Sequence, residues 1–445
     1  MPMKSNLLYK DQKYQNRIDQ LTMFLLIANT ANPFFYLSVQ MLSISFAALL
    51  LLLFLKKGAG FRLNGYFWLY MIVLVVLQIA QCLVYHAFPL KTFLGEYLRI
   101  AFAVVAIGIL GDAFFDRFVR FVYVFAIISL CFYIPCILFR GLIPILENLA
   151  GHFKAPFANA AYSMYNDSIN LIIFNLNQID LYRNSGFYWE PGTHGGFLIL
   201  ALFINLFYRK DLWKSRTNLI FFICILTTLS TTTYLALFFV TLVYLRNFFF
   251  KRPALSVFIL LIVAGLSLVL YTKLDFLNEK INKQIEYSNK GVPGERRFNS
   301  FLADMRLMGD HELIGTGRNI EMKFGEKFYN LDSQTIHRNN GVGVLLSTYG
   351  ILFFILFFWL SGRTFYRVLQ NKTNAWMAVL LLLIIGFSED YFFKSFFIAI
   401  PLYCGITLFP LNKRRMGRSG KMKLGKNTFI HNPEYHTNHE HNTSR

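Results

Sequence analysis

Charged residues are scarce in this sequence. Only 15% of its 445 residues are Asp, Glu, Lys or Arg, whereas an ordinary soluble domain has about 25%. Apolar residues make up 55%, with 49 Phe among them, and they form long runs without charge such as 121–139 and 254–271. Because a hydrocarbon core about 30 Å thick needs about 20 apolar residues per helix, this composition excludes an ordinary soluble domain. It predicts an all-α polytopic membrane protein.

Cysteine is also scarce. The five cysteines lie in apolar segments, where a thiol behaves as a small hydrophobic side chain. They therefore predict neither a disulfide framework nor a metal site. The first residues, M-P-M-K-S-N-L-L-Y-K-D-Q-K, carry a long charged stretch and no small-residue cleavage site, so we expect no cleaved signal peptide.

The apolar runs predict about twelve transmembrane helices. Residues 21–55 contain no charge, and Asn32-Pro33 within them favours two helices over one. The expected spans are 21–37, 39–55, 64–87, 97–111, 121–139, 193–208, 217–231, 233–249, 254–271, 342–360, 374–388 and 395–410.

Basic residues outnumber acidic ones by 44 to 24, and their placement predicts the topology. Loops rich in Lys and Arg stay in the cytoplasm. With both termini inside, the cytoplasmic segments carry the whole net charge of +20 and the other segments cancel. We therefore expect the positive charge to face anionic lipid and not nucleic acid. The predicted order is a cytoplasmic N-terminus (1–20), N-terminal transmembrane helices (21–139), a first extracytoplasmic loop (140–192), central helices (193–271), a second extracytoplasmic loop (272–341), C-terminal helices (342–410) and a basic, disordered cytoplasmic tail (411–445).

The two long loops face the same side in this topology, and loops of such length are usually functional or disordered. In the second, apolar residues recur in F-N-S-F-L-A-D-M-R-L with nearly helical spacing. This predicts an amphipathic helix at the membrane surface, with a helix that merely caps the bundle as the alternative.

The first loop ends in R-N-S-G-F-Y-W-E-P-G-T-H-G-G, residues 183–196. Pro191 suits the first turn of a helix, whose free N–H groups attract anions. Arg183 adds a forked donor that matches phosphate oxygens. Glu190 and His194 lie where the chain enters the membrane, a position where a charge is costly and usually functional. The alternative is a structural belt of Phe187, Tyr188 and Trp189 that anchors the helix among the headgroups.

The second loop carries a similar cluster. Glu295 is followed by Arg296, Arg297 and Arg306, and then by the turn I-G-T-G-R at 314–318. The loop ends in I-H-R-N-N-G-V-G-V, where His337, Arg338 and Asn339 precede a helix. Histidine exchanges protons near neutral pH, so two such loop ends meeting in one cavity would hold a polyanion beside a base.

Four stretches resemble the O-antigen polymerase and O-antigen ligase superfamily of bacterial cell-surface polysaccharide enzymes. They are R-N-S-G-F-Y-W-E-P (183–191), L-S-T-T-T-Y-L-A-L (229–237), E-R-R-F-N-S-F-L-A-D-M-R-L-M-G-D-H-E-L-I-G-T-G (295–317) and I-H-R-N-N-G-V-G-V-L-L-S-T-Y-G-I (336–351). Ten residues separate Arg306 from Gly317, similar to an Arg-x10-Gly pattern of the polymerases. The chain departs from the pattern where Arg338 separates His337 from Asn339 and where Glu312-Leu313 replaces Pro-Leu.

The resemblance implies inverting glycosyl transfer without metal or cofactor at the outer face of the bacterial cytoplasmic membrane. The donor would be a glycan on undecaprenyl pyrophosphate, and the partners would include membrane lipid and the chain-length regulator and flippase of the pathway. Arginines that stabilise the pyrophosphate would accelerate the step. The expected catalytic residues are His337, with Glu190 as runner-up, and the expected substrate-binding residues are Arg183, Arg296, Arg297, Arg306, His194, Arg338 and Asn339.

Two other functions remain open. An O-antigen ligase would pass the glycan to lipid A core or to a protein. A non-enzymatic flippase of lipid-linked glycan would show internal repeats and charged or broken helices, and we expect neither, because the charges lie almost wholly at the ends of the predicted helices.

Overall fold

The computed structural model describes residues 2–36, 38–57, 60–153, 168–177, 182–211, 213–251, 297–309, 311–319 and 340–408. It is 76% helical. The elements are α1 (Pro2–Ala31), α2 (Pro33–Tyr36), α3 (Val39–Leu55), β1 (Phe61–Leu63), α4 (Gly65–Tyr85), α5 (Leu90–Leu110), the 3-10 helix η1 (Gly111–Ala113), α6 (Phe114–Leu138), α7 (Leu142–Ala150), β2 (Ser168–Asn170), β3 (Asn175–Asn177), β4 (Arg183–Gly186), α8 (Pro191–Phe207), α9 (Arg216–Thr227), α10 (Thr231–Lys251), α13 (Arg297–Met308), α16 (Gly341–Leu369), α17 (Lys372–Gly386), α18 (Ser395–Tyr403) and β5 (Ile406–Leu408).

Among the described residues, three helical stretches are long and apolar enough to cross a membrane. They are α4, the stretch Leu90–Leu138 that joins α5 to α6, and α16. Five shorter helices, α3, α8, α9, α10 and α17, are also apolar. The chain is therefore an all-α membrane protein, as the composition predicted. The count of about twelve spans stays a prediction, since 254–271 lies outside the described residues.

The apolar run 21–55 is broken at Asn32-Pro33, the feature that favoured more than one helix, although the break lies inside the expected span 21–37. α1 ends at Ala31 and α2 begins at Pro33, because a proline nitrogen cannot continue the hydrogen-bond ladder. The Asn32 amide stabilises the break by donating to the carbonyls of Phe187, at 2.8 Å, and Ile172, at 2.9 Å. These two hydrogen bonds connect the N-terminal helices to the segment before α8.

Five other helices begin at an Asn or Ser whose side chain accepts a hydrogen bond from the first turn. Such N-caps satisfy backbone donors that have no partner within the helix. They are Ser38, Asn64, Ser215, Asn340 and Asn371.

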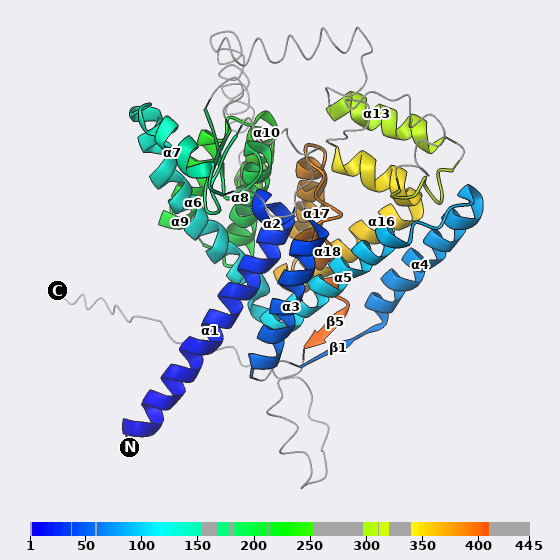
Figure 1. Cartoon of the computed structure of the whole chain (residues 1–445), viewed down its shortest axis with the longest axis horizontal. Coiled ribbons are helices and arrows are strands. Elements are labelled where there is room, and N and C mark those ends of the chain that lie inside the picture. The colour runs from blue at the N-terminus through cyan, green and yellow to red at the C-terminus, as the bar shows by residue number, and fades with distance from the viewer. Residues whose placement is uncertain are drawn as a thin grey trace, which may run out of the picture.

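The bundle has two ends of different character (Figure 1). One, which we name the terminal end, holds the start of α1, the end of α3 and the start of α6. Lys56 and Arg117 both pair there with Asp19. The opposite end, which we name the loop end, holds α7, the β2–β3–β4 sheet, the starts of α8 and α16, and α13 (Figure 1). The described parts of both long loops thus lie at one end, and the membrane topology itself stays a prediction.

A two-stranded sheet closes part of the terminal end. β1 pairs with β5 in antiparallel register, from Phe61 opposite Leu408 to Leu63 opposite Ile406. The predicted helix over 395–410 is therefore wrong in its second half. α18 ends at Tyr403, after nine residues, and the chain continues as a strand.

The first long loop contains regular structure. It begins with α7 and then forms the antiparallel sheet β2–β3–β4. Phe174 is fully buried beside this sheet and stacks on Phe132 of α6 at 5.2 Å. In the second long loop, the expected helix is present as α13. Its contacts with α16 place it beside that helix.

α16 is interrupted at Gly350, where φ is 73° and ψ is 179°. The turn 311–317 packs into the break. Its backbone N–H groups at Thr316 and Gly317 donate to the carbonyls of Ser347, at 2.8 Å, and Thr348, at 3.0 Å. These carbonyls have lost their helical partners, and the turn replaces them. The expectation that no helix is broken is therefore wrong for α16.

Aromatic rings fill the centre of the bundle. Phe396 of α18 stacks on Phe118 of α6 at 4.6 Å and packs against Phe197 of α8 at 5.5 Å. Helices in lipid associate through close packing, since lipid chains are as apolar as their side chains. These fully buried rings provide such packing through many dispersion contacts.

Candidate functional site

The stretch from Arg183 to Gly196 forms β4, a short connection and the start of α8. Pro191 is the first residue of α8, as predicted. Glu190 is the N-cap, with φ −152° and ψ 163°, but its side chain makes no capping hydrogen bond. The carboxylate of Glu190 is therefore not used to hold the helix.

The glycines of this stretch leave room for neighbouring side chains. Gly186 has φ 55°, and a Cβ there would lie 2.5 Å from the His194 ring. A Cβ on Gly195 would lie 1.9 Å from the hydroxyl of Thr233, and one on Gly196 would lie 2.3 Å from that of Tyr391. Since the first turn of α8 is fully buried, its glycines serve helix packing. The anion-binding helix terminus expected there stays a prediction.

His194 is an interior residue, which corrects its prediction as a substrate contact. Its side chain is 1% exposed. The ring stacks on Tyr188 at 5.3 Å, and its two nitrogens lie near the Asn184 carbonyl and the Cys224 thiol. Phe187 and Tyr188 are also fully buried, so the predicted headgroup belt is wrong for both.

Arg183 lies at the loop end, half-buried beside the turn between α9 and α10. Its Nε donates to the carbonyl of Thr228 at 3.1 Å. Arg306 is exposed on α13. Arg297 begins that helix, whereas Arg296, His337, Arg338 and Asn339 lie outside the described residues. The predicted meeting of Arg183 with His337 therefore stays a prediction.

Three basic side chains gather at the loop end, and we name Arg99, Arg318 and Lys394 the basic cluster. Arg99 comes from α5, Arg318 from the segment after the 311–317 turn, and Lys394 from the turn before α18. The positive charges of Arg99 and Arg318 both act on Lys394. Like charges repel, so such a group is expected where an anion binds.

Arg318 directly follows the turn 311–317, which packs into the break in α16. Its guanidinium carbon lies 4.6 Å from the centre of the Phe393 ring, a cation–π contact. Its Nη1 is buried and has no hydrogen-bond partner among the described residues. A buried guanidinium nitrogen normally has an acceptor, so this donor can serve a bound oxyanion.

Lys394 lies between two aromatic rings. Its ammonium is 4.9 Å from the ring centre of Tyr36 and 5.8 Å from that of Trp189. Burial, opposed by the charge of Asp390 and aided by the charges of Arg99 and Arg318, lowers the pKa of Lys394 to about 8. The lysine thus changes its charge just above neutral pH.

Two carboxylates accompany the basic cluster. Glu96 is buried in α5, where it accepts a hydrogen bond from Gln78 at 2.8 Å and another from the Tyr349 hydroxyl. The charges of Arg318 and Arg99 both act on it. Asp390 is partly buried, and its Oδ1 has no hydrogen-bond partner within the described ranges.

The start of α16 adjoins this group. A Cβ on Gly341 would lie 2.3 Å from the carbonyl of Glu389, so α16 begins against the turn that carries Asp390 and Lys394. The side chain of Asn340 accepts from the Gly343 N–H at 2.9 Å and fixes that start. The described start of α16 therefore lies beside the turn that carries Lys394 of the basic cluster.

The sequence carried a weak signal for these residues. The predicted span 97–111 begins inside a helix, since α5 starts at Leu90. Glu96 and Arg99 are therefore inside α5 and not at its end. A charge within an apolar helix is costly and is usually functional. Among the described residues, no group of three or more His, Cys, Asp or Glu side chains could hold a metal ion.

Comparisons of the chain with protein-family models, with curated proteins and with solved structures find no match.

Proposed function

We propose that this protein is a polymerase of polysaccharide repeat units carried on undecaprenyl pyrophosphate. It would join them by metal-independent, inverting glycosyl transfer on the extracytoplasmic side of a bacterial cytoplasmic membrane. The observation that carries the proposal is the basic cluster. Three cations from separate segments meet at the loop end of a membrane protein in which charge is scarce.

In the proposed reaction, a hydroxyl of the acceptor sugar attacks the anomeric carbon of the donor. The new glycosidic bond forms as the bond from that carbon to the pyrophosphate oxygen breaks. The pyrophosphate leaves with the bonding electrons, and the hydroxyl proton passes to a base. Fixed positive groups that meet the developing negative charge lower the barrier, and Arg99, Arg318 and Lys394 supply them.

The proposed base is His337, three residues before Asn340, and Glu190 is its alternative. Support for Glu190 comes from its place next to Trp189, whose ring contacts Lys394. Arg183, Arg296, Arg297, Arg306, Arg338 and Asn339 remain proposed contacts for the remaining phosphate and sugar oxygens.

The proposed orientation has both termini in the cytoplasm, so that the loop end faces outward. It is supported by the terminal end, where Lys56 and Arg117 lie with the exposed Arg17 and Arg120. Such positive residues stay on the cytoplasmic side. The chain-length regulator and flippase of the same pathway are proposed partners.

A ligase that transfers the glycan to lipid A core or to protein uses the same donor chemistry and differs only in its acceptor. A flippase is the alternative of another class, and the broken helix α16 favours it, because discontinuous helices line many transporter sites. Flippase activity can be measured only across a membrane that separates two compartments, whereas glycosyl transfer can be measured in detergent solution.

The proposal can be tested in cells by substituting His337→Ala and Arg183→Ala separately and reading glycan chain length on a gel. Lys214→Gln, an exposed lysine before α9, is the control. We expect shortened or absent polymer in the first two and normal polymer in the control. Normal polymer in both test variants would remove these two residues from the site.

A further inference from the structure

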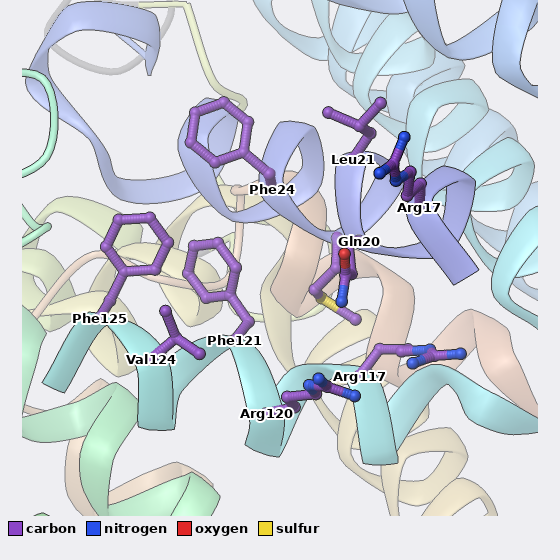
Figure 2. Close-up of a pocket in the computed structure, with 10 residues that line it drawn as sticks. Arg17, Gln20, Leu21, Phe24, Arg117, Arg120, Phe121, Val124 and Phe125 are labelled. Carbon is purple, nitrogen blue, oxygen red and sulfur yellow. The ribbon is translucent and has the colours of Figure 1, made fainter. Parts of the chain in front are cut away.

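A second basic site lies at the terminal end, far from the basic cluster. It is a pocket of about 480 Å³ between α1 and α6 (Figure 2). Its lining residues are Arg17, Gln20, Leu21, Met23, Phe24, Arg117, Arg120, Phe121, Val124 and Phe125.

One half of the pocket is apolar. The rings of Phe24, Phe121 and Phe125 group at one side of it, as Figure 2 shows. Their centres are 6.4 Å apart from Phe24 to each of the others and 4.4 Å from Phe121 to Phe125. Leu21 and Val124 are 52% and 43% exposed. Apolar surface this open suits a hydrocarbon chain.

The other half is basic. Arg17 of α1 lines the pocket across from Arg117 and Arg120 of α6, and all three lie away from the phenylalanine rings (Figure 2). The Arg117 guanidinium is fixed by Asp19 at 3.2 Å and by the side chain of Asn16 at 2.5 Å. Asp19 also pairs with Lys56, so its charge is already balanced. Arg17 and Arg120 are exposed and form no ion pair within the described residues.

The boundary between the two halves matches the edge of the apolar sequence. After Asp19, α1 and the helices that follow carry no charge until Lys56, and after Arg120 the rest of α6 carries none. In a bilayer this order would put the arginines at headgroup depth and the phenylalanines at acyl-chain depth.

We propose that this pocket binds one anionic glycerophospholipid of the leaflet at the terminal end. Arg17 and Arg120 contact its phosphate and headgroup, with Arg117 behind them. One acyl chain follows Leu21, Phe24, Val124 and Phe125. Basic pockets between transmembrane helices bind anionic headgroups in this way, and guanidinium groups match phosphate oxygens. A zwitterionic headgroup would add a cation to an already basic pocket, so charge favours the anionic lipid. The proposal does not depend on the catalytic function.

The test is native mass spectrometry of the detergent-purified full chain titrated with phosphatidylglycerol or phosphatidylcholine. Arg17→Gln/Arg120→Gln removes the two charges that form no ion pair within the described residues and leaves the Asp19–Arg117 pair intact. Lys214→Gln/Arg216→Gln removes two exposed charges elsewhere and is the matched control. Val124→Trp fills the apolar half without changing charge.

We expect one phosphatidylglycerol to be retained by the parent and by the control. Its affinity should fall on the order of thirtyfold in the double arginine variant, since each basic residue contributes about a factor of five at an anionic surface. Val124→Trp should also weaken binding. Equal retention of the two lipids by the parent, or unchanged phosphatidylglycerol binding in both pocket variants, would overturn the proposal.

Discussion

The guanidinium group of Arg318 lies 4.6 Å from the centre of the Phe393 ring, one residue before Lys394. This contact brings the turn after α13 to the turn before α18. Together with Arg99 of α5, it assembles a positive site from segments that are distant in the sequence.

Glycosyl transfer should decrease as pH rises through about 8. Burial holds the pKa of Lys394 near that value, with Arg99 and Arg318 lowering it and Asp390 raising it. Above it the lysine loses its proton and one positive charge leaves the site. Lys394→Arg keeps its charge at every such pH, so its rate should stay level between about pH 7 and 9.5. A parent and a variant that decline together would show that another group titrates.

Gly350→Ala should damage the site through the backbone. Its φ of 73° is open almost only to glycine, and a Cβ there would lie 2.2 Å from the Leu313 carbonyl. We expect a loss of about 1–3 kcal/mol in the free energy of unfolding, with displacement of the turn before Arg318. Thermal unfolding in detergent measures the loss.

Gly362→Ala in the same helix is the control. Its Cβ would lie 3.5 Å from Val379, an ordinary contact, and alanine favours a helix by about 0.5–1 kcal/mol. An unfolding temperature that stays level or rises in Gly362→Ala is expected. A similar decrease in both variants would contradict the special role of the break.

Asp19→Asn should destabilise the terminal end strongly. The Asp19 side chain is 7% exposed and pairs with Lys56 and Arg117, so its loss leaves two partly buried cations without a counter-charge. Removing one partner of such a buried ion-pair group lowers the free energy of unfolding by about 3–5 kcal/mol. Asp116→Asn breaks the Asp116–Arg209 pair, whose side chains are 49% and 41% exposed, and should cost less than about 1 kcal/mol. Chemical denaturation in detergent compares them, and equal losses would refute the distinction.

His194→Ala should lower stability and leave the rate per folded molecule unchanged. The ring fills space against Gly186, Tyr188 and Cys224. Its removal leaves a cavity that costs about 2–4 kcal/mol. The unfolding temperature and the rate of glycosyl transfer, measured on the same preparation, separate the two effects. A variant that folds like the parent and transfers no sugar would restore His194 to the site.

Local signals in the sequence predicted two helix boundaries. Pro191 begins α8, and Asn32-Pro33 separates α1 from α2. Each depends on residues within one turn of the boundary, because caps and prolines act over that distance. The apolar composition likewise predicted a helical membrane protein without knowledge of any contact.

Features that depend on distant segments were missed. The break at Gly350 exists because the turn 311–317 supplies the donors that α16 gives up. His194 is buried because β4 and α9 cover it. The basic cluster needs three segments in contact, and no periodicity in any one of them predicts that meeting.

The central claim is tested most directly by purifying the protein in detergent and supplying undecaprenyl-pyrophosphate-linked oligosaccharide as donor and acceptor. The measured quantity is the rate at which longer lipid-linked chains form. We predict elongation without added metal, a rate about 100-fold lower in Arg318→Gln, and a parental rate in the exposed control Arg216→Gln. No elongation by the folded parent, or equal rates in Arg318→Gln and the parent, would contradict the account.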